Sequence, residues 1–312
     1  MASNEVGTLD AASTVEKLHE IAAGRALNRR RFVAALGMTG AAAGAGLMSG
    51  CSNGTVVSST TSGSTTSSAQ LDALVFALNI EYLQATFYAY ITQGTDLSAS
   101  LTASSGAVTG APSKLTFTGT NAQQITDMLN EIYFDEVGHV TTLRTLLGSS
   151  GIARPALNLA AFGAISATNA LSISRLLEDV GVTAYTGVAS SLGNSNLTFA
   201  AQILAVESFH SGALRLVSVQ NPTLSAYVAA DTQDVRPADP GSSVAAAGPT
   251  SAGSFFPTYG ASAANSTAGM AFSRTASQVL AVLYGSAGSA AATGASSGGF
   301  FPSGVNGNVK TV

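Results

Sequence analysis

Glu136 and His139 lie three residues apart in a stretch with helical periodicity, so a carboxylate and an imidazole share one helix face. Apolar residues before and after this pair recur in steps of three and four, and the pair occupies two positions where that stripe should be apolar. The stripe consists of Ile125, Leu129, Ile132, Leu143 and Leu146. A buried carboxylate without a partner is costly unless it takes up a proton or finds a cation. The pair therefore requires a buried partner, and a metal ion is the obvious candidate.

The same chemistry recurs in other helical stretches of the chain. Glu207 and His210 repeat the Glu-x-x-His spacing on a stripe of Ile203, Leu214 and Val217. Single glutamates, Glu81 and Glu178, lie on apolar faces of two further stretches. The candidate metal ligands are Glu81, Glu136, His139, Glu178, Glu207 and His210.

Spacing alone is weak evidence, because Glu16 and His19 also lie three residues apart in a solvated, charged stretch near the N-terminus. The composition of the chain after Cys51 is more specific. That part contains five Glu and two His, and only Glu131 falls outside the candidate set. Each residue taken singly has an ordinary explanation, such as a hydrogen-bonded core histidine or a glutamate paired with Arg175. The complete set favours a metal centre.

Four long helices must position these residues. The patterns predict helices from Ser67 or Ser68 to Gly94, from Thr120-Asn121 to Gly148, over about 164–192, and from near Asn196 to about 220. A glutamine three residues after the start of the second helix indicates a capping box. Residues 96–119 are expected to form a loop or small hairpin, and the join 148–163, which contains Pro155, a long crossover. A short helix is predicted from Thr275, capped by Gln278, to Tyr284. We therefore predict an all-α, up-down four-helix bundle.

One Glu from each of two helices and a Glu-x-x-His from each of the other two is the ligand set of dinuclear carboxylate bundles. By this motif, residues 70–220 resemble the ferritin-like superfamily. Within it, the chain is similar to exported bacterial ferritin-like proteins related to plant desiccation-related proteins. More loosely, Phe272 to Tyr284 and the stretch Gly298-Gly299-Phe300-Phe301-Pro302 resemble the C-terminal region of that group.

The resemblance implies two Fe ions bound by the six residues, with two Mn ions as the alternative. Four carboxylates balance the charge of two divalent ions, and oxygen-rich ligands with two imidazoles suit iron or manganese. Three functions stay open: a ferroxidase-like or oxygen- or peroxide-handling iron protein, a manganese catalase-like enzyme, and a non-enzymatic envelope stress protein with a structural metal. Iron storage in a shell is less expected, because of the linker and the long C-terminal sequence.

Composition narrows the remaining function classes. The chain has 312 residues, 10% of them charged, with a formal net charge of -4. No basic patch interleaved with aromatic residues indicates nucleic-acid binding. Cys51 is the only cysteine, which excludes an intramolecular disulfide framework and Cys-based metal cages. Metal ligands must then be oxygen and nitrogen atoms.

The first fifty residues have the pattern of a targeting segment. Arg29 and Arg30 precede a weakly apolar run, 34–48, which resembles a twin-arginine export signal and is too short for a stable membrane span. The residues before Cys51 resemble a lipoprotein box, except that Met48 stands where Leu is usual; the alternative is an ordinary signal with a chance cysteine. The expected plan is a signal over 1–51, a Ser/Thr-rich linker over 52–69, the bundle over 70–220 and a loop-rich extension over 221–312. The expected location is the periplasm or cell envelope, reached through the twin-arginine machinery, with a lipid anchor if Cys51 is modified.

Overall fold

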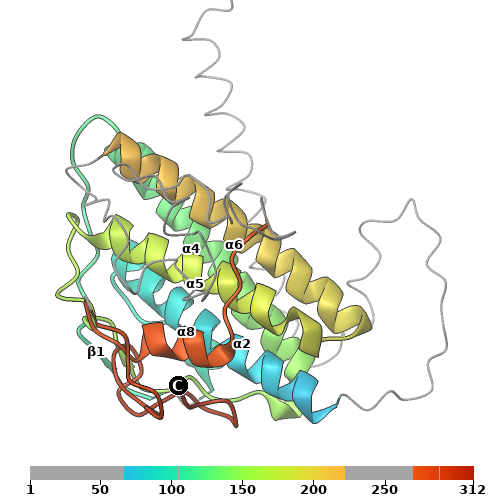
Figure 1. Cartoon of the computed structure of the whole chain (residues 1–312). Coiled ribbons are helices and arrows are strands. Elements are labelled where there is room, and N and C mark those ends of the chain that lie inside the picture. Colours follow the sequence, from blue (N-terminus) through green and yellow to red (C-terminus); the bar gives the residue numbers. More distant parts are fainter. Residues whose placement is uncertain (1–66, 104–105, 222–269, 288) are drawn as a thin grey trace, which may run out of the picture. The chain divides into compact units, whose positions relative to one another are not determined.

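The structure is a computed structural model that describes residues 67–103, 106–221, 270–287 and 289–312. Four long helices form the bundle (Figure 1), with α2 packed mainly against α4 and α5 packed mainly against α6. Their bounds are α2 Ser68–Tyr88, α4 Ala122–Leu147, α5 Ala170–Val188 and α6 Asn194–Gln220. The predicted all-α bundle is therefore confirmed.

Helix α2 lies at the centre of the bundle. Ser67 caps its first turn by accepting a hydrogen bond from Gln70 N at 3.3 Å. Every residue from Ala73 to Tyr88 is buried, so from Ala73 onward the helix has no solvent face. The π-helix η1, Ala89–Gln93, continues it and ends at Gly94, whose φ of 74° suits glycine. A helix buried on all sides needs covering elements beyond its three partner helices.

The C-terminal segment supplies part of that cover. Asn79 on α2 exchanges hydrogen bonds with the backbone of Asn306, through Nδ2 to the carbonyl at 2.9 Å and from the amide N to Oδ1 at 2.9 Å. Gly307 lies so close to α2 that a Cβ would approach Val75 Cγ1 to 2.5 Å. Phe300 and Phe301 are fully buried, and Phe300 stacks on Phe162 with ring centroids 5.0 Å apart.

Helix α8, Ala276–Leu283, packs on α5 and carries the predicted capping box. Thr275 Oγ1 accepts from Gln278 N at 3.3 Å, and Thr275 N donates to Gln278 Oε1 at 2.8 Å. The backbone just before α8 lies close to α5, where a Cβ on Gly187 would meet Arg274 O at 1.8 Å. Gly187 therefore permits this contact between the C-terminal segment and the bundle.

The connections differ from the sequence prediction in three places. The described residues of the segment before α4, 96–103 and 106–119, form no hairpin. After the short helix α3, Ala99–Thr102, the strand β1, Val108–Thr109, pairs in parallel with β2, Leu157–Asn158, in the α4–α5 crossover. That crossover also contains the 3-10 helix η2, Gly148–Ser150. The pairing joins residues too far apart in the chain for local alternation to indicate it.

The predicted capping box of α4 is wrong. Asn121 is the N-cap but makes no capping hydrogen bond, and its side chain instead donates to Asn221 Oδ1 at 3.1 Å. Helix α5 begins six residues later than predicted, at Ala170. Asn169 accepts from Ser166 N at 2.8 Å and donates to Ala164 O at 2.9 Å, so its side chain holds a turn in place of the first helical residues. The 3-10 helix η3, Ala189–Ser191, follows α5.

Among the described residues, none of the helices has the length and hydropathy of a membrane span. The apolar run 34–48, the arginines Arg29 and Arg30, the lipidation candidate Cys51 and the linker 52–66 lie outside the described residues. The Phe-Phe-Pro sequence of residues 300–302 also occurs at 255–257, and this earlier copy lies outside the described residues.

Candidate metal centre

All four long helices contribute to one buried cluster in the bundle core. Glu81 comes from α2, Glu136 and His139 from α4, Glu178 from α5, and Glu207 and His210 from α6. The four glutamates are fully buried, and the two histidines are 7% and 6% exposed. The structure thus brings together all six residues singled out in the sequence.

The six residues form two overlapping groups, each able to hold one metal ion. One consists of Glu81, Glu136, His139 and Glu207, and the other of Glu136, Glu178, Glu207 and His210. Within each group the potential ligand atoms lie within 4.8 Å of one another. Glu136 and Glu207 belong to both groups, so two ions held by these groups would share them as ligands.

Distances around the histidines are nearly the same in the two groups. His139 Nδ1 lies 3.1 Å from Glu81 Oε2 and 3.2 Å from Glu207 Oε1. His210 Nδ1 lies 2.9 Å from Glu178 Oε2 and 3.3 Å from Glu136 Oε1. The ring centroids are 6.3 Å apart. An approximate two-fold relation therefore exchanges the two Glu-x-x-His pairs, with Nδ1 of each ring facing the carboxylates.

Two features of the cluster fit metal ions. Neither oxygen of the buried Glu136 carboxylate has a hydrogen-bond partner among the described residues, a costly arrangement for an isolated protein carboxylate. On α5, Gly181 leaves room for Glu207, since a Cβ there would lie 1.9 Å from Glu207 Oε2. The donor set of carboxylate oxygens and imidazole nitrogens suits iron or manganese.

Electrostatics in the metal-free cluster show how strongly it demands positive charge. Burial and the Glu178 charge raise the pKa of Glu136 to about 7, and burial with the charge of Glu136 raises the pKa of Glu207 well above its usual value. Burial opposes protonation of both histidines, but nearby carboxylates outweigh it. Glu81 and Glu136 raise the pKa of His139 well above its usual value, and the nearby carboxylates of Asp135, Glu136 and Glu178 raise the pKa of His210 to about 12. Without metal, bound protons balance the carboxylates.

The pKa of Glu81 moves in the opposite direction. Burial alone would raise it, but the charge and hydrogen bond of His139 lower it below its usual value, helped by the Tyr185 hydroxyl. Tyr185 Oη donates to Glu81 Oε1 at 2.5 Å. Burial and the Glu81 charge raise the pKa of Tyr185 well above its usual value, so it stays a donor.

Asp135 and Gln84 also support the ligands. Asp135 Oδ2 lies 3.2 Å from His210 Nε2. Gln84 Nε2 donates to Glu207 Oε2 at 2.9 Å and, more weakly, to Glu178 Oε1 at 3.4 Å. Such outer partners orient the ligands of a metal centre.

Gln84 and Tyr88 also border the site, although neither is a predicted site residue. Tyr88 is fully buried, and burial together with the charges of Glu178 and Glu136 raises its pKa well above the usual value. The available signal was position, since the two residues follow Glu81 by three and seven and so share its helix face.

Other polar residues near the ligands in sequence belong elsewhere. Asp179, next to Glu178, binds Arg175, Arg215 and Ser211. Arg175 therefore pairs with Asp179 rather than with a ligand glutamate. Tyr82, next to Glu81, accepts from Arg144 at 2.6 Å.

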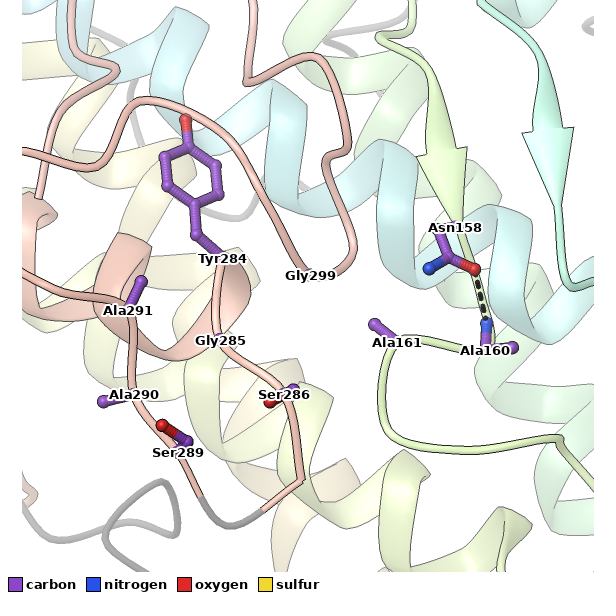
Figure 2. A pocket seen from close by; sticks show the side chains of 10 residues that line it. All are labelled: Asn158, Ala160, Ala161, Tyr284, Gly285, Ser286, Ser289, Ala290, Ala291 and Gly299. Carbon is purple, nitrogen blue, oxygen red and sulfur yellow. Dashed lines mark hydrogen bonds between the residues drawn. The ribbon is translucent and has the colours of Figure 1, made fainter.

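A separate pocket of about 350 Å³ lies at the C-terminal segment, between 158–161 and 284–299. Figure 2 shows its lining, mostly alanine, glycine and serine, with the hydrogen bond from Ala160 N to Asn158 Oδ1. None of the six clustered residues lines it. The pocket offers few side-chain groups for chemistry.

Comparison with known proteins agrees with this geometry. No curated protein matches the chain. A family model, described as the ferritin-like domain, matches residues 69–220, which contain all four bundle helices and all six clustered residues. Residues 69–220 therefore belong to the ferritin-like domain family.

Proposed function

We propose that the protein binds a dinuclear iron centre at these six residues and uses it to react with oxygen or hydrogen peroxide. The observation that carries this proposal is Glu136, a fully buried carboxylate without hydrogen bonds that belongs to both ligand groups. A protein carboxylate in this setting is destabilising unless a cation lies beside it. Two cations held by the two ligand groups would remove that cost.

Charge and donor type favour two divalent ions. Four glutamates carry four negative charges and two divalent ions carry four positive ones, so the loaded centre is neutral. Bound iron would supply one-electron redox chemistry that the protein's own side chains lack. The chain's residues hold the ions close together, exclude bulk water and keep the ligands oriented: Tyr185 on Glu81, Asp135 on His210 and Gln84 on Glu207.

Manganese is the alternative metal, because iron and manganese both accept this donor set. With manganese bound, the expected activity is peroxide disproportionation. A metal that only stabilises the bundle would make the protein a non-enzymatic envelope component. These alternatives differ in the bound metal and in turnover, and not in the fold.

The export signal gives this proposal a cellular setting. We infer that Arg29 and Arg30 direct the folded protein through a twin-arginine route, and that lipidation of Cys51 anchors it at the envelope. Export in the folded state would allow the centre to be loaded before the protein leaves the cytoplasm.

Replacing both arginines by lysine should keep the protein inside the cell, and Cys51→Ser should release it from membranes. Normal export of the first variant or unchanged membrane association of the second would contradict the corresponding assignment.

Metal analysis of the full-length protein as isolated, followed by absorption spectra under oxygen and after peroxide addition, tests the function. Two iron ions per chain with an oxygen- or peroxide-dependent absorption change are expected. Bound manganese with peroxide consumption would replace the iron proposal by the catalase-like one. A bound metal that does not respond to either reagent would leave the structural role, and absence of metal binding would overturn the centre itself.

A further inference from the structure

The two halves of the proposed centre have matching ligands and differ in what lies behind the histidines. Asp135 directly precedes Glu136 on α4, and its carboxylate reaches across to His210 on α6. The corresponding residue of α6, directly before Glu207, is Val206. By the approximate two-fold relation, Val206 stands where a carboxylate would reach His139.

This difference in sequence appears as a difference in hydrogen bonding. His210 Nε2 lies 3.2 Å from Asp135 Oδ2, while no hydrogen bond joins His139 Nε2 to any of the described residues. An N–H donated from Nε2 to a carboxylate fixes the tautomer that leaves the Nδ1 lone pair for a metal. When a metal displaces the Nδ1 proton, the contact with Asp135 would keep the remaining proton on Nε2 and so hold His210 in its ligating form. No described residue would do the same for His139.

The carboxylate also makes His210 a better donor. Negative charge on Asp135 raises the electron density of the imidazole, and removal of such outer partners commonly weakens metal binding about 10- to 100-fold. In the other half, the short hydrogen bond from Tyr185 withdraws electron density from Glu81 and makes it a weaker ligand. This also favours the half that contains His210. Gln84 donates to Glu178 and so weakens a ligand of the His210 half, but this effect is small because the contact is long, at 3.4 Å, and the donor is a neutral amide.

We propose that the two metal positions are inequivalent, that the Glu178–His210 position fills first and more tightly, and that Asp135 is the positioning residue responsible. This inference rests on the proposed dinuclear centre and adds the order in which it is loaded. It gives the protein a state with one tightly held ion and one exchangeable position at Glu81 and His139.

Stepwise titration of the chelator-treated full-length protein with Co²⁺, against a competing chromophoric chelator, measures both affinities. Shared carboxylates make the second ion weaker even in a symmetric centre, so the test compares mirror-image variants. His139→Ala should keep a first binding step near that of the wild type. His210→Ala should weaken that step about 10-fold or more. Equal first-step affinities in the two variants would overturn the inference.

Substitutions behind the histidines separate positioning from general damage to the bundle. Asp135→Asn should weaken the first step about 10- to 100-fold. Asp127→Asn is the matched control, because it removes the same charge from an exposed position on α4 whose partner is Gln123. If Asp135→Asn binds Co²⁺ as tightly as the Asp127→Asn control, Asp135 is not the positioning residue.

The double variant Asp135→Asn/Val206→Asp moves the carboxylate to the other half. In that background His139→Ala should become the more damaging histidine substitution, a reversal that a purely structural role of Asp135 would not produce. A persistent preference for the His210 half would overturn the assigned cause. Failure of the wild type to bind two ions would refute the proposed function, whereas two ions with identical mirror variants would refute only the inequivalence.

Discussion

Two buried acidic sites draw on neighbouring residues of α5 and α6 and are built in opposite ways. At the first, Glu136 is a carboxylate whose two oxygens receive no hydrogen bond among the described residues. At the second, Asp179 accepts from Ser211 at 2.6 Å, from Arg175 at 3.0 Å and twice from Arg215, at 3.2 and 2.5 Å. Both carboxylates are fully buried. The first site is completed only by added cations, and the second is complete with the protein's own groups.

Neighbouring residues in the sequence therefore have different roles. Glu178 and His210 face the metal cluster, while the next residues, Asp179 and Ser211, join the arginine network. Because that network ties α5 to α6 directly behind two ligands, it serves as a rigid support for them. The comparison predicts that damage to the network lowers stability by a similar amount with and without metal, and that damage to the cluster lowers stability chiefly by removing metal.

The largest effect is expected for Asp179→Ala. Removing this carboxylate leaves two buried arginines without their shared partner, and breaking a buried pair typically costs about 3–5 kcal/mol. The free energy of unfolding should fall by a similar amount in metal-loaded and in chelated protein, as measured by denaturant titration. A loss confined to the loaded protein would show that Asp179 belongs functionally to the metal cluster.

Metal removal should have the next largest effect. When the free metal concentration is 100 to 1,000 times the dissociation constant, binding stabilises the folded state by about 2.7–4.1 kcal/mol. Chelation should therefore lower the melting temperature of the wild type. Glu136→Ala and His210→Ala should lose much of this difference between loaded and chelated protein, and should bind fewer than two ions per chain. Wild-type metal content in either variant would exclude that residue as a ligand.

A smaller effect is expected from pH in the chelated protein. Groups whose pKa is raised by folding hold protons more tightly in the folded state, so their stabilisation is lost as pH rises through the folded pKa. For Glu136, stability falls over the pH range from its unfolded pKa to its folded pKa of about 7. For His210, stability falls from its unfolded pKa of about 6.5 up to its folded pKa of about 12. Glu81, with a lowered pKa, acts in the other direction only at lower pH.

The melting temperature of the chelated protein should therefore fall by several degrees between about pH 5 and pH 8. Glu136→Gln keeps the shape without the charge and should remove much of this slope. It should also be more stable than the chelated wild type at neutral pH. A flat profile for the chelated wild type would contradict the proton balance inferred for the cluster.

How far the sequence predicts this site depends on residue type. Charged residues on apolar stripes are conspicuous, which is why the four glutamates and two histidines could be selected without a structure. Neutral polar residues are not. Asn79 and Gln84 are both fully buried amides on α2, yet Asn79 binds the backbone of Asn306 and Gln84 binds Glu207. Only position relative to Glu81 distinguishes them: Gln84 follows it by three residues and shares its helix face, whereas Asn79 precedes it by two and does not. The partners themselves come from distant segments and cannot be predicted from the local pattern.

Predictability of the fold follows the same division between local and distant contacts. The capping box of α8 uses residues three apart and could be read from the sequence. The pairing of β1 with β2 is only two residues long and joins Val108 to Leu157, so no alternation of apolar and polar residues predicts it. The predicted start of α5 is too early because Asn169 can either cap a helix or hold a turn before it. Its side-chain hydrogen bonds to Ser166 N and Ala164 O hold a turn, so the helix begins after it.

The smallest effect is expected at Glu131, the one glutamate after Cys51 that lies outside the cluster. It shares α4 with Glu136 but is exposed, so solvent and surface contacts stabilise its charge without a metal ion. Glu131→Ala should change the free energy of unfolding by about 0.5 kcal/mol or less and leave two metal ions per chain, as measured by denaturant titration and metal analysis. Set beside Glu136→Ala, this substitution tests whether burial on the stripe, rather than the presence of a glutamate on α4, makes a ligand. Loss of metal from the Glu131→Ala protein would mean that the ligand set extends to the helix surface, and that burial is the wrong criterion for it.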